Sequence, residues 1–163
     1  MACAYCKEER PLTREHIYPE NLINKFPEAD FAFIGLDKAF KLSPKKHVIK
    51  DVCGECNNGE LSKLDSYGID FIMKYFSTES GPGDILNIEY NYDYLSRWVL
   101  KNTYNAVREF ENKDPGWLNT NSKFIINAED YKSRFSIFLG SHVDMAPLNL
   151  EMTCYSKLFV IQE

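Results

Sequence analysis

Apolar side chains recur at helical intervals in two stretches of this chain. The first stretch, residues 57–76, begins with two asparagines, a residue type that often caps helices. The second stretch, residues 92–110, is followed by the helix-stopping sequence Asp114-Pro115-Gly116. Because positions three and four apart lie on one face of a helix, both stretches predict amphipathic helices.

Alternating apolar and polar positions predict strands elsewhere. Residues 12–18 predict a short strand that Pro19 ends, and residues 46–52 predict another. Further strands are predicted at residues 123–127, 134–139 and 150–161. Helices and strands together indicate the α+β class.

A polar, glycine-rich segment at residues 77–83 separates the two predicted helices and has the composition of a linker. We therefore predict one unit over residues 1–76, followed by an extension of helix and strands over residues 77–163. The sequence assigns no role to this extension. Because the chain ends inside its last apolar alternation, we also expect that it is truncated.

Composition bounds the class of protein. Hydrophobic residues make up 44% of the chain, which is enough for an apolar core. No apolar run reaches the ~20 residues that span a bilayer, and no basic-then-apolar leader opens the chain. We expect a soluble, cytoplasmic protein that does not bind membranes.

The charge of the chain gives two opposing indications about nucleic acid. A net charge of −5 argues against binding over a broad basic face. Residues 38–50, however, hold five lysines and no acid. This strip predicts either a surface that faces phosphates or a solvated strand edge protected by lysines. Its lysines are Lys38, Lys41, Lys45, Lys46 and Lys50.

Four of the five cysteines form two matching pairs, Cys3 with Cys6 and Cys53 with Cys56. A C-x2-C step on a tight turn points two sulfurs at one place, so two steps predict a tetrahedral thiolate site for Zn²⁺. Disulfides are the alternative, and a reducing cytosol favours the metal.

Residues beside the cysteine pairs have the chemistry of phosphodiester hydrolysis, which needs a base and a cation. His16 is the candidate base, because a histidine can accept a proton near neutral pH. Glu15 and an oxygen of Asn57 or Asn58 are hard ligands that suit Mg²⁺ or Mn²⁺. Consecutive strand residues point to opposite faces, so Glu15 and His16 share a site only if the strand is twisted or bulged. The sequence thus predicts a structural zinc and a separate catalytic ion.

Taken together, these motifs resemble the zinc-containing HNH endonucleases of the ββα-metal fold, over roughly residues 1–70. The resemblance implies a ββα core, His16 as general base, Glu15 and Asn57 as metal ligands, and cleavage of nucleic acid, usually DNA. The motifs are Cys3-x2-Cys6, Leu12-Thr13-x-Glu15-His16-Ile17-x-Pro19-x-x-Leu22, and Val52-Cys53-Gly54-Glu55-Cys56-Asn57-Asn58-Gly59 with the Leu-Ser-Lys-Leu-Asp helix that follows.

The chain departs from the pattern of this family at two places. Glu15 stands where Asp or His is commoner. The central asparagine of the family has no clean counterpart, and His47, six residues before Cys53, lies about where it is expected. The partner that orients the base therefore stays open. Asn57 fits the family spacing better than Asn58.

Two functions of different classes stay open. The first is a metal-dependent endonuclease in which Lys41, Lys45, Lys46 and Lys50 hold the nucleic-acid backbone. Because the rest of the chain is acidic, binding would then rely on a partner subunit or a homo-oligomer, and a lone nuclease module of this kind would suit phage defence. The second is a non-catalytic zinc-binding interaction module, which has no need for the pair Glu15-His16.

Overall fold

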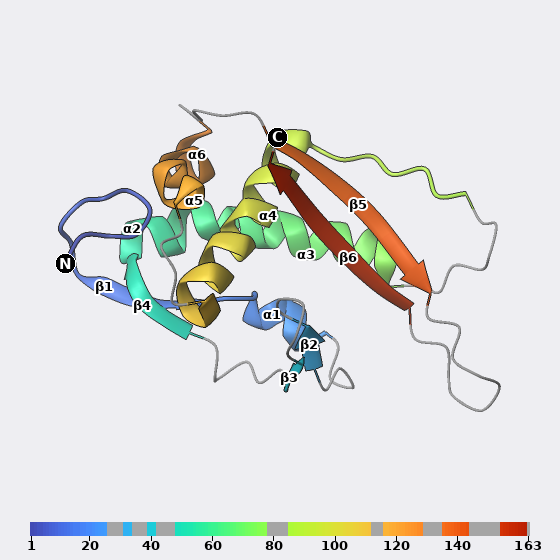
Figure 1. Cartoon of the computed structure of the whole chain (residues 1–163), viewed down its shortest axis with the longest axis horizontal. Helices are drawn as coiled ribbons and strands as arrows, with labels where there is room; N and C mark the ends of the chain where they lie inside the picture. Colours follow the sequence, from blue (N-terminus) through green and yellow to red (C-terminus); the bar gives the residue numbers. More distant parts are fainter. Residues whose placement is uncertain are drawn as a thin grey trace.

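The computed structural model describes residues 1–25, 31–33, 39–41, 48–77, 85–111, 116–128, 135–143 and 154–162. For residues 31–33, 39–41, 110–111, 135–143 and 154–162 the description covers the backbone alone. Helices and two-stranded antiparallel sheets make up this part of the chain (Figure 1). The predicted α+β class is confirmed at this level.

The strands β1, Leu12–His16, and β4, Val48–Cys53, form the sheet that carries the candidate site. They pair antiparallel, with Leu12 opposite Cys53 and His16 opposite Val48. The register shifts between Thr13 and Glu15. Both strands were predicted, with slightly different bounds, and the irregularity that a shared Glu15-His16 site requires lies beside Glu15.

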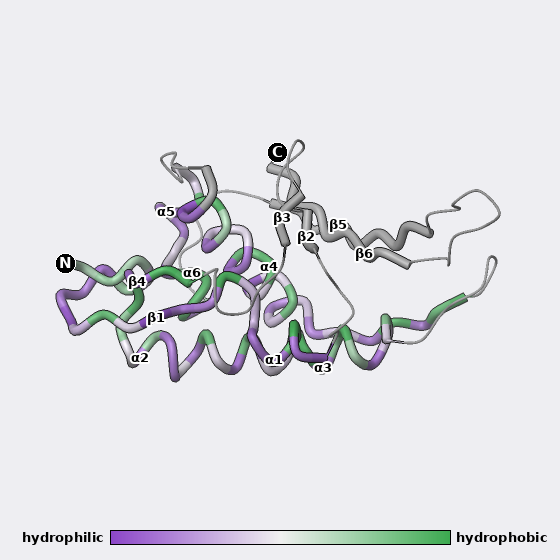
Figure 2. Tube along the Cα trace, turned by 90° about the horizontal axis from the view of Figure 1, so that it is seen from below, coloured by the Kyte–Doolittle hydropathy of each residue, from purple (hydrophilic) through white to green (hydrophobic). Residues whose placement is uncertain are grey.

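A nearly continuous helical segment follows β4 and places the second cysteine pair next to the candidate site. The backbone kinks at Gly59, where φ is −94° and ψ is −108°. Figure 2 shows apolar and polar positions alternating along the path of the helix beyond this kink. The segment consists of α2, Gly54–Cys56, the π-helical turn η1, Asn57–Leu61, and α3, Ser62–Phe76. That β1, β4 and this helical segment form the ββα core of a nuclease stays a prediction.

The second predicted helix is present as α4, Tyr92–Ala106, which continues as the π-helical turn η2, Val107–Glu111. The side chain of Asn91 caps α4 by accepting a hydrogen bond of 3.2 Å from the backbone N–H of Tyr94. Two short helices come next, α5, Trp117–Thr120, and α6, Ser122–Asn127. The remaining elements are α1, Glu20–Ile23, the strand pair β2, Phe31–Phe33, with β3, Ala39–Lys41, and the strand pair β5, Phe135–Val143, with β6, Cys154–Gln162.

The strand predicted at residues 123–127 is wrong, because these residues form α6. A short apolar run fits a buried helix as well as a strand, and packing decides between them. Here Phe124 and Ile125 are buried in the core, and the Arg97 side chain of α4 donates a 2.9 Å hydrogen bond to the Ile125 carbonyl. The strands predicted at residues 134–139 and 150–161 are confirmed as β5 and β6 with shifted bounds.

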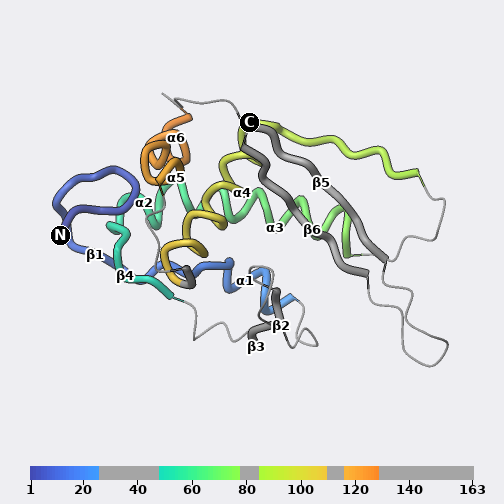
Figure 3. Tube along the Cα trace, in the orientation of Figure 1, coloured from blue at the N-terminus to red at the C-terminus, as the bar shows by residue number. Residues whose placement is uncertain are grey.

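One apolar core joins segments from both sides of residue 76. It contains Tyr5 of the first cysteine loop, Leu64 of α3, Trp98 of α4 and Ile125 of α6. Figures 1 and 3 show α4 crossing α3. The predicted linker at residues 77–83 lies outside the described residues except for Ser77. Helices α3 and α4 therefore pack directly against each other. This packing also brings α4 close to β1 and β4, the strands of the candidate site.

The crossing of α3 and α4 depends on Gly68. A Cβ atom on this buried residue would overlap the indole ring of Trp98. We expect Gly68→Ala to destabilise the fold by about 1–3 kcal/mol, because overpacking outweighs the roughly 1 kcal/mol by which alanine favours a helix. The measurement is urea denaturation, with a lower midpoint and an unchanged slope.

Asp70→Ala is the control for this substitution, since it changes an exposed residue of the same helix and adds no atom between α3 and α4. Wild-type stability in Gly68→Ala would contradict the close packing of Trp98 on α3.

Candidate active site and metal centre

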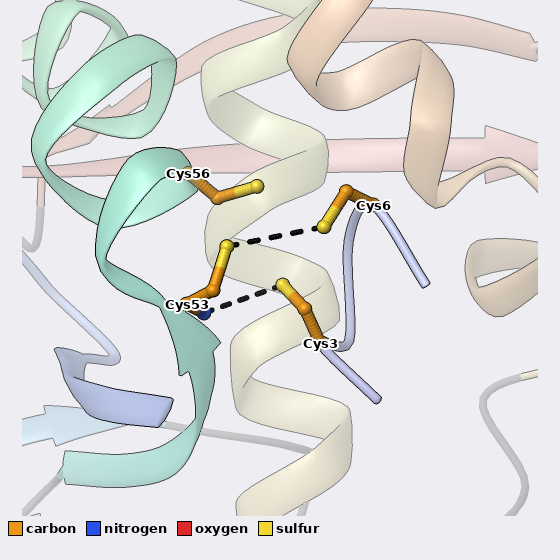
Figure 4. Close-up of side chains that lie close together, drawn as sticks. All are labelled: Cys3, Cys6, Cys53 and Cys56. Atoms are coloured by element: carbon orange, nitrogen blue, oxygen red, sulfur yellow. Dashed lines mark hydrogen bonds between the residues drawn. The ribbon is translucent and has the colours of Figure 1, made fainter. Parts of the chain in front are cut away.

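The four paired cysteines meet at one place. Their sulfur atoms all lie within 4.8 Å of one another. Figure 4 shows them converging from the first loop and from the junction of β4 with α2. The Sγ atoms of Cys6 and Cys53 are 3.9 Å apart. Sulfurs about 2.3 Å from a tetrahedral zinc ion lie about 3.8 Å from each other, whereas a disulfide needs about 2.05 Å. The cluster can therefore hold a metal ion such as zinc.

Backbone hydrogen bonds shape the first cysteine loop. The Ala4 N–H donates to the Asp51 carbonyl at 2.8 Å, which ties this loop to β4. The Lys7 N–H donates to the Cys3 carbonyl at 3.0 Å. This bond closes the tight turn that contains both cysteines of the pair. Lys7 has a positive φ of 65°, the left-handed conformation that such a tight turn uses.

The environment of Cys3 favours a thiolate. Burial raises the pKa of the Cys3 thiol, but hydrogen bonds from backbone N–H groups outweigh burial and lower this pKa to about 7. One of these donors is the Cys53 N–H, 3.3 Å from Cys3 Sγ. At Cys56, burial raises the pKa of the thiol. Because metals bind the thiolate, this environment favours metal binding by Cys3 near neutral pH.

A polar cleft of about 240 Å³ lies beside the cysteine cluster, between β1, α1, η1 and α3. The sequence predicts five residues for catalysis. Four of them line the cleft, namely Glu15, His16, Asn57 and Asn58, and the fifth is His47. The lining also includes Asp65 of α3, which the sequence analysis missed. The structure thus brings together residues that follow the first cysteine pair and residues that follow the second.

His16 ends β1 and lies at the accessible side of the cleft. Its side chain is 35% exposed, and Nε2 is 3.9 Å from a carboxylate oxygen of Glu20 in α1. This distance is too long for a hydrogen bond, although it allows an ion pair when the imidazole is protonated. The His16 carbonyl accepts a 3.2 Å hydrogen bond from the Asn105 side chain of α4. The backbone is therefore held while the imidazole stays accessible.

Asn57 is oriented by β1. Its Nδ2 donates to Thr13 Oγ1 at 3.0 Å and to the Arg14 carbonyl at 2.7 Å. These bonds engage the two amide protons at the irregular part of the strand, so Oδ1 is the atom that the side chain can offer to a ligand. Asn58, the alternative, is exposed at the start of the helical segment.

Glu15 is 4% exposed and belongs to a buried charged cluster. Lys101 of α4 is fully buried, and its Nζ lies 2.8 Å from Glu15 Oε1 and 2.6 Å from Asp65 Oδ1. Burial raises the pKa of the Asp65 carboxyl, and the Lys101 ammonium opposes this rise. The inner side of the cleft therefore carries two carboxylates that share one ammonium.

The other predicted residues are placed less fully. Lys50 is exposed on β4, and Lys41 lies in β3, where the backbone alone is described. Lys45, Lys46 and His47 lie outside the described residues. The phosphate-facing strip and the role of His47 stay predictions.

No protein-family model, curated protein or solved structure matches this chain. Among the helices that the structure describes, none is both long enough and apolar enough to cross a membrane. The function of the protein is therefore inferred from the geometry of the cleft and the cysteine cluster.

Proposed function

We propose that this protein is a metal-dependent endonuclease of the HNH type, with a ββα-metal core that a structural zinc ion stabilises. It hydrolyses phosphodiester bonds of nucleic acid, and we expect DNA to be the substrate. The observation that carries the proposal is the convergence of Glu15, His16 and Asn57 on one polar cleft next to a four-cysteine cluster.

The donor set of the cleft fits a hard cation. Glu15 offers a carboxylate oxygen and Asn57 an amide oxygen, and such ligands suit Mg²⁺ or Mn²⁺ better than the thiolates of the cysteine cluster do. When bound, this cation supplies positive charge that stabilises the leaving oxygen of the phosphodiester. The two metals then have separate tasks, zinc in the structure and the hard cation in catalysis. The thiolate ligands and the oxygen ligands lie in separate places, the cysteine cluster and the cleft, and this supports the division.

His16 accepts the proton of the attacking water. Its accessible imidazole lines the cleft. The carboxylate of Glu20, 3.9 Å away, stabilises the imidazolium that forms. Glu20 thus acts on His16 through its charge, and His47 stays the candidate for the orienting partner that the sequence pattern leaves open. Lys41, Lys45, Lys46 and Lys50 are proposed to bind the nucleic-acid backbone, with a partner subunit or a second copy supplying further contacts.

A plasmid-nicking assay with Mg²⁺ or Mn²⁺ tests this proposal. We expect wild-type protein to nick the plasmid and Glu15→Gln to lower the rate by about 100-fold or more, because the cation loses an anionic ligand. Glutamine keeps the shape of the side chain and an oxygen acceptor for Lys101, so the zinc content and the circular dichroism spectrum should match those of the wild type.

Asp70→Asn is the control, since it removes a carboxylate at an exposed position of α3 that does not line the cleft. It should nick like the wild type. Absence of nicking by the wild type with either ion, on DNA and RNA, would contradict the proposed activity.

The second candidate function is a non-catalytic zinc-binding interaction module. The buried ion pair between Glu15 and Lys101 favours it, because such a pair can serve the fold alone. The same assay separates the two functions: a module of this kind binds zinc and folds, and neither the wild type nor Glu15→Gln nicks the plasmid.

A further inference from the structure

Helix α4 reaches the inner side of the cleft through two fully buried polar side chains, Lys101 and Asn105. Both contact the same oxygen of Glu15. Lys101 Nζ is 2.8 Å from Oε1, and Asn105 Nδ2 donates to Oε1 at 3.3 Å. Both donors therefore act on Oε1. Oε2 is therefore the oxygen left for a ligand in the cleft.

The two donors are themselves fixed. Lys101 Nζ lies 2.6 and 2.7 Å from the two carboxylate oxygens of Asp65, so it cannot leave Glu15 without also straining its bonds to Asp65. The Oδ1 atom of Asn105 accepts hydrogen bonds from the Tyr5 hydroxyl at 2.6 Å and from Arg108 Nη2 at 3.0 Å. These contacts settle the direction of the Asn105 amide, which then presents Nδ2 to Glu15.

We propose that Lys101 and Asn105 are positioning residues that restrict Glu15 to one cation-binding oxygen, and that this restriction selects Mg²⁺ or Mn²⁺ over Ca²⁺. The inference rests on the proposed function, because it concerns the catalytic cation of that site. Ca²⁺ takes six to eight oxygens and often binds a carboxylate through both of them. Mg²⁺ demands a near-ideal octahedron, and sites of this oxygen type also suit Mn²⁺. A carboxylate that can offer one oxygen therefore favours the octahedral ions.

The double variant Lys101→Met/Asp65→Asn tests the restriction without a change of charge. In the wild type, two carboxylates and one ammonium give the cluster a net charge of −1. The double variant keeps this charge on Glu15 alone while it frees Oε1 from the ammonium. Because both test ions are divalent, any remaining electrostatic effect acts on both. The ratio of their affinities therefore reports whether Glu15 binds the cation through one oxygen or through two.

The measurement uses the zinc-loaded full chain. Mn²⁺ affinity comes from the electron paramagnetic resonance signal of free Mn²⁺, and Ca²⁺ affinity comes from competition with Mn²⁺. We expect the wild type to prefer Mn²⁺, and we expect the ratio of Mn²⁺ to Ca²⁺ affinity to fall about tenfold in the double variant. This readout does not depend on catalysis.

Asp65→Asn alone is the matched control. It leaves Lys101 on Glu15 Oε1, so the affinities for both ions should shift together while their ratio stays at the wild-type value. Zinc content and circular dichroism report folding. If the double variant does not fold, Asn105→Ala replaces it, because this substitution removes one donor to Oε1. The ratio of Mn²⁺ to Ca²⁺ affinity should then fall by less than the tenfold expected for the double variant.

The outcomes separate this inference from the proposed function. A wild-type affinity ratio in the folded double variant, or in Asn105→Ala where that variant replaces it, would overturn the positioning role, and nicking that still depends on Glu15 would leave the nuclease proposal standing. If Glu15→Gln binds Mn²⁺ as tightly as the wild type, the cation binds elsewhere. That result would overturn both the inference and the proposed cation site.

Discussion

Cys53→Ser is expected to lose zinc and to unfold the core that surrounds β4. Cys53 is 1% exposed, and its sulfur lies in a cluster that is itself part of the apolar core. Ligation of a structural zinc contributes about 10–16 kcal/mol in zinc-finger peptides, whereas a whole domain is stable by about 5–15 kcal/mol. Loss of even half of the zinc-binding free energy is therefore comparable to the entire stability of the fold.

The measurement combines metal analysis of the purified protein with thermal denaturation followed by circular dichroism. Cys154→Ser is the matched control, because Cys154 lies in β6 and belongs to neither cysteine pair. It should retain one zinc ion per chain. A Cys53→Ser protein that keeps its zinc and melts like the wild type would show that the cluster is not the structural metal site that we propose.

Local patterns in the sequence predicted the parts of the fold that depend on nearby residues. The helices α3 and α4 follow from apolar stripes, and β1 and β4 follow from alternation bounded by Pro19 and Cys53. The cysteine cluster follows from spacing, since each C-x2-C step fixes two sulfurs by its own turn. Short local motifs also contain Glu15, His16 and Asn57, and this explains why the cleft could be anticipated.

Interactions over long sequence separations were missed. Arg97, Lys101 and Asn105 repeat every four residues on α4, which in sequence is typical of a solvated polar face. All three are buried. Asp93 pairs with Arg97 within α4, but the other carboxylate partners of Arg97 and Lys101, namely Glu60, Glu15 and Asp65, come from other elements. Neither periodicity nor composition encodes that pairing. One signal for this pairing was available in the sequence. A line of polar residues runs beside the apolar stripe of the second helix, and the candidate site contains an acid for which no partner was predicted.

The extension beyond residue 76 shows the same limit. The sequence assigned no role to it, whereas α4 packs on α3 and touches Glu15 through Lys101 and Asn105. The hydrogen bond from Asn105 of α4 to Glu15 of β1 joins residues that are 90 positions apart in the sequence. Only the folded chain shows this contact. The geometry makes α4 a supporting element of the cleft under either proposed function.

His16→Ala is expected to lower the nicking rate by about 10²–10⁴-fold, the range that a general base contributes. The fold should survive this substitution. The His16 side chain is 35% exposed, and its ion-pair partner Glu20, 3.9 Å away, is itself exposed to solvent. The backbone contact from Asn105 to the His16 carbonyl does not depend on the side chain. Loss of activity with wild-type zinc content and melting temperature would therefore report chemistry and not stability.

Plasmid nicking at saturating Mg²⁺ measures this effect, and added imidazole supplies a second readout. If His16 accepts the proton of the attacking water, free imidazole that enters the cleft should restore part of the rate of His16→Ala, because the substitution leaves space at that position. His142→Ala, which changes the same residue type in β5, should nick like the wild type and should not respond to imidazole. Wild-type nicking by His16→Ala would contradict the assignment of the base, and loss of nicking without rescue, accompanied by weaker Mn²⁺ binding, would place His16 among the cation ligands instead.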